Sequence, residues 1–275
     1  MKERKKIALV LGGGSALGFA HIGVIKVLEE YGVPIDIVVG TSMGGLVGAS
    51  YSAGLSVEEM TEHATKFKTI HFVDINFAGD GIFAGTGVMR AINKFLPDEK
   101  IESLNKAFAC VAVDLMNEKE VVFRTGKLRD AVRATLSIPG FFNTHKADDK
   151  LLVDGGVLNN LPEDVAMEMG ADIIISCDVL EDYRLLKKPD GAIDVLMAAL
   201  NCLTKEVVKY KSHHADVKIT PNLSEFKQMY FSKDTTLKII EKGQEACEKE
   251  IKNILSLIKK RWDFLIFFVV MPLYI

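Results

Sequence analysis

The first fifty residues alternate between short apolar runs and segments in which apolar positions recur at helical spacing. Residues 7–11 form an unbroken apolar run that ends in glycines, which predicts a buried strand. Residues 19–30 have apolar positions on one helical face and stop at Tyr31-Gly32. An apolar run at 35–39 and a following segment at 44–52 predict a second strand and a second helix. This order is typical of a parallel sheet covered by helices.

The rest of the chain continues this pattern. The run at 173–179 is almost wholly apolar, as expected for a strand buried on both faces. Gly243 interrupts the last helical segment, and we expect a weak point or break there. The Phe- and Gly-rich stretch 68–97 has two interpretations, a mobile apolar cover over a site or an irregular connection. We predict strands at 107–114, 120–124, 151–153 and 173–179, and helices at 56–66, 194–211 and 234–260.

Composition and charge exclude several classes of protein. A formal net charge of -3 argues against a nucleic-acid binder, which usually carries a basic patch. Cys110, Cys177, Cys202 and Cys247 are far apart and form no CxxC pair, so neither a zinc site nor a redox motif is predicted. The N-terminal apolar run breaks at Gly12, too early for a secretion signal. Reduced thiols and the lack of a leader favour a cytoplasmic location.

The end of the sequence differs from the rest. Residues 264–275 are charge-free and apolar, and basic residues at 259–261 precede them. A membrane span needs about 20 apolar residues, so this segment cannot cross a bilayer alone. It has two interpretations, a peripheral contact with a membrane interface or a tail that packs on the domain or in an oligomer. We therefore divide the chain into a main domain, 1–260, and an apolar tail, 261–275, with the oligomeric state unknown.

A candidate nucleophile follows the second predicted strand. The residues Gly40-Thr41-Ser42-Met43-Gly44 fit the pattern G-x-S-x-G, which places a serine on a sharp turn between a strand and a helix. Gly40 and Gly44 allow the strained turn. The N-terminus of the following helix favours negative charge that develops near Ser42.

The glycine-rich turn at 12–18 follows the first predicted strand. Glycines expose backbone N–H groups and permit positive φ. A dinucleotide-binding turn would require glycine where Ser15 stands and an acidic residue after the second strand, where Gly40 lies instead. The alternative is an oxyanion hole, in which each N–H donor contributes about 3 kcal/mol. The serine turn just downstream favours the oxyanion hole, with candidate donors at Gly12, Gly13, Gly14 and Ser15.

A candidate base, Asp154, ends the strand predicted at 151–153 and precedes Gly155-Gly156. On its own this pattern is more typical of an ordinary turn aspartate. His145 is the best rival base, because most serine hydrolases use a histidine. His21 is expected to pack in the first helix. No histidine pair has metal-ligand spacing, so we predict no metal and no cofactor.

Taken together, these motifs resemble those of the patatin-like phospholipase family, over about 7–178 in motif order. The resemblance implies a three-layer α/β/α fold with a mostly parallel central sheet. It also implies a Ser–Asp dyad without histidine, with Ser42 as nucleophile, Asp154 as base and the glycine turn as oxyanion hole. The motifs that carry it are Gly12–Gly18 with Ala20-His21-Ile22-Gly23-Val24, Gly40–Gly45, Ser137-Ile138-Pro139-Gly140-Phe141, and Asp154-Gly155-Gly156 with Asn159-Asn160-Leu161-Pro162.

The chain departs from the family pattern in its first motif. Leu17 stands where the family usually has Arg or Lys, and Ser15 replaces a common glycine. Backbone donors survive a change of side chain, but the missing cation puts phosphate-bearing substrates in doubt.

The predicted function is a lipid acyl hydrolase that cleaves fatty-acyl esters through an acyl-enzyme on Ser42. Three alternatives stay open. One is an acyltransferase or thioesterase that uses the same serine. Another is a catalytically weak lipid-binding or regulatory protein of the same fold. The third, a nucleotide-binding oxidoreductase, rests on the glycine turn alone.

Overall fold

Eight strands form one sheet in the computed structural model, which describes residues 4–72, 74 and 79–267. The strand order is β5-β6-β3-β2-β1-β7-β8, with β4 paired to β3. The neighbours from β3 through β8 run parallel, whereas β4, β5 and β6 pair in antiparallel fashion. The strands are β1 (Ile7–Leu11), β2 (Ile37–Thr41), β3 (Ala107–Asp114), β4 (Lys119–Phe123), β5 (His145–Ala147), β6 (Lys150–Asp154), β7 (Ile173–Cys177) and β8 (Val217–Ile219).

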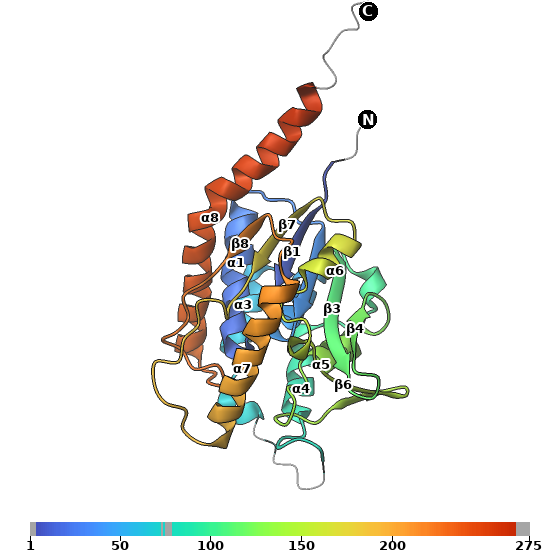
Figure 1. Ribbon diagram of the computed structural model, residues 1–275, viewed down its shortest axis with the longest axis vertical. Helices are drawn as coiled ribbons and strands as arrows, with labels where there is room; N and C mark the ends of the chain where they lie inside the picture. The colour runs from blue at the N-terminus through green and yellow to red at the C-terminus, as the bar shows by residue number, and fades with distance from the viewer. Residues whose placement is uncertain (1–3, 73, 75–78, 268–275) are drawn as a thin grey trace, which may run out of the picture.

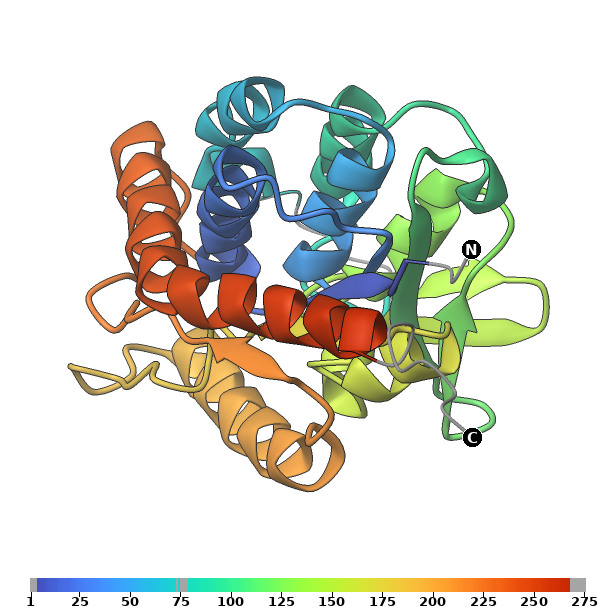
Figure 2. The same cartoon turned by 90° about the horizontal axis from the view of Figure 1, so that it is seen from above.

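Helices cover both faces of this sheet (Figure 1, Figure 2). Figure 2 shows the blue helices α1 and α2 on one side and the orange helix α7 on the other. The helices are α1 (Ala20–Glu30), α2 (Met43–Ser52), α3 (Val57–Thr65), α4 (Thr86–Phe95), α5 (Leu128–Thr135), α6 (Glu163–Glu168), α7 (Ala192–Lys211) and α8 (Lys233–Phe267), with short 3₁₀ turns at Ser15–Phe19, Thr69–Phe72, Ile101–Ser103 and Gly155–Val157.

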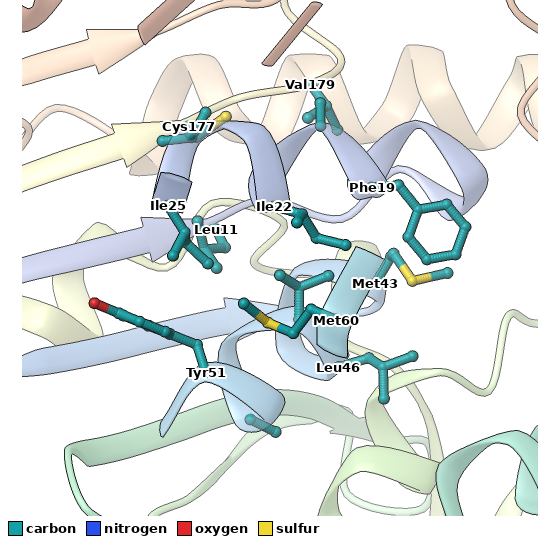
Figure 3. Close-up of a cluster of buried hydrophobic side chains, with 14 of the residues drawn as sticks. Leu11, Phe19, Ile22, Ile25, Met43, Leu46, Tyr51, Met60, Cys177 and Val179 are labelled. Carbon is teal, nitrogen blue, oxygen red and sulfur yellow. The ribbon is translucent and has the colours of Figure 1, made fainter. Parts of the chain in front are cut away.

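Alternation along β1 explains the three layers. Leu9 and Leu11 belong to the larger core, which α1, α2 and α8 also build, whereas Ala8 and Val10 pack with α6 on the opposite face. Successive side chains of a strand point to opposite faces, so a strand that is apolar at every position needs cover on both sides. Figure 3 shows the larger core, where Leu11 lies near Ile22 and Ile25 of α1. The predicted α/β/α fold is confirmed.

The predicted break at Gly243 is wrong, because α8 continues through it. A Cβ atom added at Gly243 would lie 1.9 Å from the carbonyl oxygen of Ala20, and one at Gly23 would lie 2.0 Å from that of Ile240. The two glycines therefore let α1 and α8 pack backbone against backbone. The sequence pattern cannot separate a helix-breaking glycine from one that a neighbouring helix requires.

The predicted strands and long helices match the structure to within a few residues, apart from α8, which runs on to Phe267. The helix α4 occupies part of the stretch 68–97, for which no element was predicted, and α5 and α6 were also missed. The helix α8 crosses the expected domain boundary at residue 260. The end of the predicted tail, 268–275, lies outside the described residues. Within the described residues, no helix is both long and apolar enough to span a membrane.

Candidate active site

Ser42 lies alone between the end of β2 at Thr41 and the start of α2 at Met43. Its backbone has φ 55° and ψ −126°, a strained conformation for a residue with a side chain. A Cβ added at Gly44 would lie 2.1 Å from the carbonyl oxygen of Leu11, and one at Gly40 would lie 2.5 Å from Gly44. Both glycines are therefore required, as the G-x-S-x-G pattern predicted, because the turn packs directly against β1.

Asp154 ends β6 and lies beside Ser42. The Ser42 side chain lies close enough to the Asp154 carboxylate to stabilise its charged form, and the N–H of Gly156 donates a hydrogen bond to the same carboxylate at 2.8 Å. The turn after Asp154 packs directly against β3 and requires Gly155, because a Cβ atom there would lie 2.3 Å from the carbonyl oxygen of Val111. The structure thus joins two residues that are far apart in the sequence.

Burial controls the protonation of Asp154, which is only 6% exposed. Loss of solvation raises the pKa of this carboxyl to about 6, although the Ser42 side chain and the hydrogen bond from Gly156 act in the opposite direction. A carboxylate with this pKa is a stronger base than an exposed aspartate and is still ionised at neutral pH.

The glycine turn contributes fewer free donors than the sequence predicted. The N–H of Gly12 donates to the Cys177 carbonyl at 3.0 Å, and that of Gly13 donates to the Asn160 carbonyl at 3.2 Å. In the described part of the chain, the N–H groups of Gly14 and Ser15 donate to no other group. The candidate oxyanion donors therefore narrow to Gly14 and Ser15.

The two candidate histidines lie elsewhere. His21 is fully buried in α1, and its Nε2 lies 2.7 Å from the Gly12 carbonyl oxygen. Burial lowers the pKa of His21 to about 4, against the opposing effect of that hydrogen bond, so the ring is neutral and supports the glycine turn. His145 lies in β5 opposite Leu152, where burial and Arg133 lower its pKa. Neither imidazole lines the cavity beside Ser42.

Two supporting residues were not predicted. Thr135, at the end of α5, accepts a hydrogen bond from the Ser42 N–H at 2.8 Å. Asn160 holds the glycine turn from the other side, because its Nδ2 donates to the Gly13 carbonyl at 3.2 Å. Asn160 lies within a motif quoted above, but nothing in the sequence showed that its amide would bind the glycine turn.

Ser42 lies where two cavities meet. The first contains Asp154 and the glycine turn and has a mixed lining, with polar side chains at Asn201, Thr204 and Gln228. The second lies between α2 and α4 and is almost wholly apolar; its lining includes Leu46, Phe67, Val88, Ile92 and Phe231. Ser15, Ser42 and Ile138 line both cavities, so the two spaces adjoin at these three residues.

The side chain at the family's basic position has no access to these cavities. Leu17 is fully buried and lines neither of them, so its replacement of Arg or Lys leaves the backbone of the turn in place.

A family model for patatin-like phospholipase matches residues 9–167, which is more than half of the chain. The chain belongs to the patatin-like phospholipase family. The matched region contains the glycine turn, Ser42 and Asp154, whereas Cys177 and the residues of α7 that line the first cavity lie outside it.

Several curated proteins are similar to the chain. Patatin-like phospholipase domain-containing protein 6 from Mus musculus is 35% identical over 262 residues, an alignment that covers 82% of this chain and 19% of that protein. An uncharacterized NTE family protein from Mycobacterium bovis is 36% identical over 174 residues, covering 62% of this chain and 48% of that protein. The chain thus spans about a fifth of the mouse relative and about half of the mycobacterial one.

The fold also resembles a solved structure. VipD from Legionella pneumophila superposes with a TM-score of 0.60 at 14% sequence identity, covering 92% of this chain and 67% of that one. At this identity the likeness concerns the fold alone, and it agrees with the α/β/α layers seen here.

Proposed function

We propose that this protein is a lipid acyl hydrolase that cleaves fatty-acyl esters, with Ser42 as nucleophile and Asp154 as general base. The observation that carries the proposal is the position of Ser42, on a strained turn, next to the buried Asp154 carboxyl in the lining of one cavity. Membership of the patatin-like phospholipase family supports lipid hydrolysis.

The reaction proceeds in two stages. The Ser42 oxygen attacks the ester carbonyl as its proton moves to Asp154, and the resulting oxyanion accepts hydrogen bonds from Gly14 and Ser15. The intermediate collapses to an acyl-enzyme, and the alcohol leaves with the proton from Asp154. Water then attacks the acyl-enzyme, again with Asp154 as base, and frees the fatty acid and Ser42.

The two cavities support an assignment of the substrate's parts. The apolar cavity between α2 and α4 suits the acyl chain, because it offers almost no hydrogen-bonding groups. The cavity lined by Asn201, Thr204 and Gln228 suits the alcohol portion, which carries further polar atoms in glycerol-based lipids. An ester carbonyl carbon bound between them lies at the Ser42 oxygen.

Covalent labelling tests this proposal. A fluorophosphonate probe should modify the intact protein at Ser42, and the substitution Ser42→Ala should remove both the label and ester hydrolysis while leaving Tm unchanged. The loss should be at least about a thousandfold, the scale seen when a nucleophile is removed. Labelling at another serine, or hydrolysis that survives Ser42→Ala, would overturn the assignment. Phospholipids, lysolipids, acylglycerols and acyl thioesters assayed side by side would define the substrate.

A further inference from the structure

Large apolar side chains are exposed on α7, a helix that lines the cavity containing Ser42, and in the loop before it. Leu185 and Leu186 are 51% and 69% exposed in the loop before α7, and Val195 and Leu203 are 55% and 64% exposed on α7 itself. We name these four residues the leucine-rich rim. Contiguous apolar patches on the surface of a soluble protein often mark a site of interaction with a membrane or a partner.

The leucine-rich rim meets the cavity at Leu203. Met197, Leu200 and Thr204 of α7 line the space beside Ser42, and Leu203 both lines that space and faces solvent. An apolar molecule that moves from the outer surface to Ser42 therefore stays in contact with apolar side chains along α7.

The rim and the C-terminal end of α8 lie at opposite ends of the molecule. In Figure 1 the loop before α7 and the start of α7 lie at the lower end, whereas α8 projects from the upper end. The carboxyl ends of β1 and β2, where the glycine turn and Ser42 follow, point toward the lower end. A surface that meets the rim at Leu203 thus meets the cavity, and the described end of α8 lies far from both.

Charges around the rim limit what it binds. Arg184, Lys187 and Lys188 flank the two leucines, and all three are exposed. The carboxylates of Asp182, Asp190 and Asp194 lie in the same stretch, so its net charge is close to zero. Arg184 donates to the carbonyls of Glu181 and Tyr183, whereas exposed lysines such as Lys187 and Lys188 can reach phosphate groups beside leucines that insert between acyl chains. Apolar insertion, and not net charge, therefore supplies most of the attraction.

Hydrogen bonds hold α7 and the rim loop against the body. Asn201 and Gln228 exchange two amide hydrogen bonds, of 2.7 and 3.1 Å, and Thr204 donates to the Gly156 carbonyl at 3.1 Å. Lys205 donates to the Tyr183 carbonyl, directly before the rim loop. The rim is thus attached firmly enough to carry an interaction to the residues around Ser42.

From these observations we infer that the leucine-rich rim docks on the surface of a phospholipid membrane and presents the cavity to it. The inference deepens the proposed function and rests on it, because only a lipid-directed site gains from this orientation.

The single exposed cysteine offers a local reporter. Cys202 lies on α7 next to Leu203, and the other three cysteines are buried, so an environment-sensitive thiol fluorophore should label Cys202 selectively. Phosphatidylcholine vesicles, with and without phosphatidylserine, should increase its emission several-fold. The substitutions Leu185→Asn and Leu186→Asn together should weaken this response about tenfold or more in vesicle concentration, because each removes a leucine from the interface. Hydrolysis of a soluble short-chain ester should stay as in the unaltered chain.

A matched reporter controls for binding elsewhere. In a chain with Cys202→Ser, the substitution Tyr210→Cys places the same fluorophore near the other end of α7, at a residue that is 77% exposed. Its emission should not change with vesicles. Vesicles that sediment the protein without any response at Cys202 would overturn the inference and assign binding to another surface. Dimers that dissociate when the leucines are replaced would also overturn it, in favour of a second copy as occupant.

The same measurements on a Ser42→Ala chain separate the two proposals. Docking requires no turnover, so the Cys202 response should persist in this chain. A response at Cys202 without serine-dependent hydrolysis would contradict the proposed function but not the docking inference. Serine-dependent hydrolysis without a response at Cys202 would contradict the docking inference but not the proposed function.

Discussion

The two walls of the cavity around Ser42 are packed in opposite ways. On one side, β1, the glycine turn and α2 are buried at every position from Ile7 to Gly14 and from Met43 to Ser52. On the other side, α7 buries only Met197, Thr204 and Val208 among its 20 residues. Strained turns persist only where their surroundings determine them fully, so the reacting groups belong on the packed wall. The exposed wall is free to meet lipid.

The packed wall also contains groups that work against stability. Asp154 and His21 are both buried, and burial shifts each pKa toward the neutral form. Neither would be favoured in a core selected for stability alone. The contrast between the two walls therefore predicts which substitutions unfold the protein, which ones stop the reaction, and which ones increase stability.

The largest effect should follow from adding one methyl group to the packed wall. In Gly44→Ala the new carbon would lie 2.1 Å from the Leu11 carbonyl oxygen and 2.7 Å from that of Gly12. Either α2 or β1 must move, and both are fixed by their neighbours. We expect a loss of about 3 kcal/mol or more in the free energy of unfolding, measured by denaturant titration.

A substitution on the exposed wall provides the control. Val195→Ala removes two carbons from a residue that is 55% exposed on α7, and its effect should stay within about 0.5 kcal/mol. If Gly44→Ala and Val195→Ala lowered the free energy of unfolding equally, the two walls would not differ in packing as described.

The next largest effect should fall on activity. Asp154→Asn preserves the shape of the side chain but removes the base, and kcat/KM should fall by at least about a hundredfold. His145→Gln and His21→Gln should each keep much more activity, provided that thermal melts show normal folding. For the intact protein, kcat/KM should rise with pH up to about 6 and then level off, because Asp154 must be ionised to act as base.

The histidine variants decide between a dyad and a triad. If His145→Gln folds normally and loses as much activity as Asp154→Asn, a triad replaces the Ser–Asp dyad. The pH profile alone is weaker evidence, since a carboxylate with a pKa of about 6 titrates where histidine does.

The smallest effect should be a gain in stability. The folded state holds a proton on Asp154 up to a pKa of about 6, whereas an unfolded aspartate loses it near 3.9. The folded state therefore loses stability as pH rises from about 4 to about 6 and stays lower above that range. Asp154→Asn cannot ionise, so its Tm at pH 8 should exceed that of the intact protein by about 3 °C or more.

The pH dependence of that gain identifies its cause. Because the cost of ionising Asp154 disappears when the carboxyl is protonated, the difference in Tm should shrink from pH 8 to pH 5. A gain that is the same at both values would point to altered packing and not to a buried charge. His21 acts in the opposite direction, since its pKa of about 4 removes stability as pH falls from about 6.5. Because His21 is present in both chains, its effect cancels in the difference in Tm between Asp154→Asn and the intact protein at each pH.

Local patterns in the sequence determined the elements that lead to the site. The apolar run of β1, the small residues around Ser42 and the Asp-Gly-Gly turn each have a period or composition that a short window reveals, and all were predicted. The helix α5 and its Thr135 were missed, although Leu128, Ala131 and Val132 recur at helical spacing, because a segment of eight residues without a glycine stop is too short for that spacing to be distinctive. Gly243 was misjudged, because its role depends on Ala20 of another helix.

Tertiary structure alone decided how those elements meet. It joined Ser42 to Asp154, occupied the Gly12 and Gly13 donors with Cys177 and Asn160, and left Gly14 and Ser15 free. It also placed α7 along the cavity, left the leucines in the loop before that helix exposed, and put the end of α8 at the opposite end of the molecule. The physical reason is the separation along the sequence of the residues that make each kind of contact. Strand and helix patterns arise from contacts within a few residues, whereas hydrogen-bond partners, burial and pKa depend on groups that the sequence separates by a hundred residues or more.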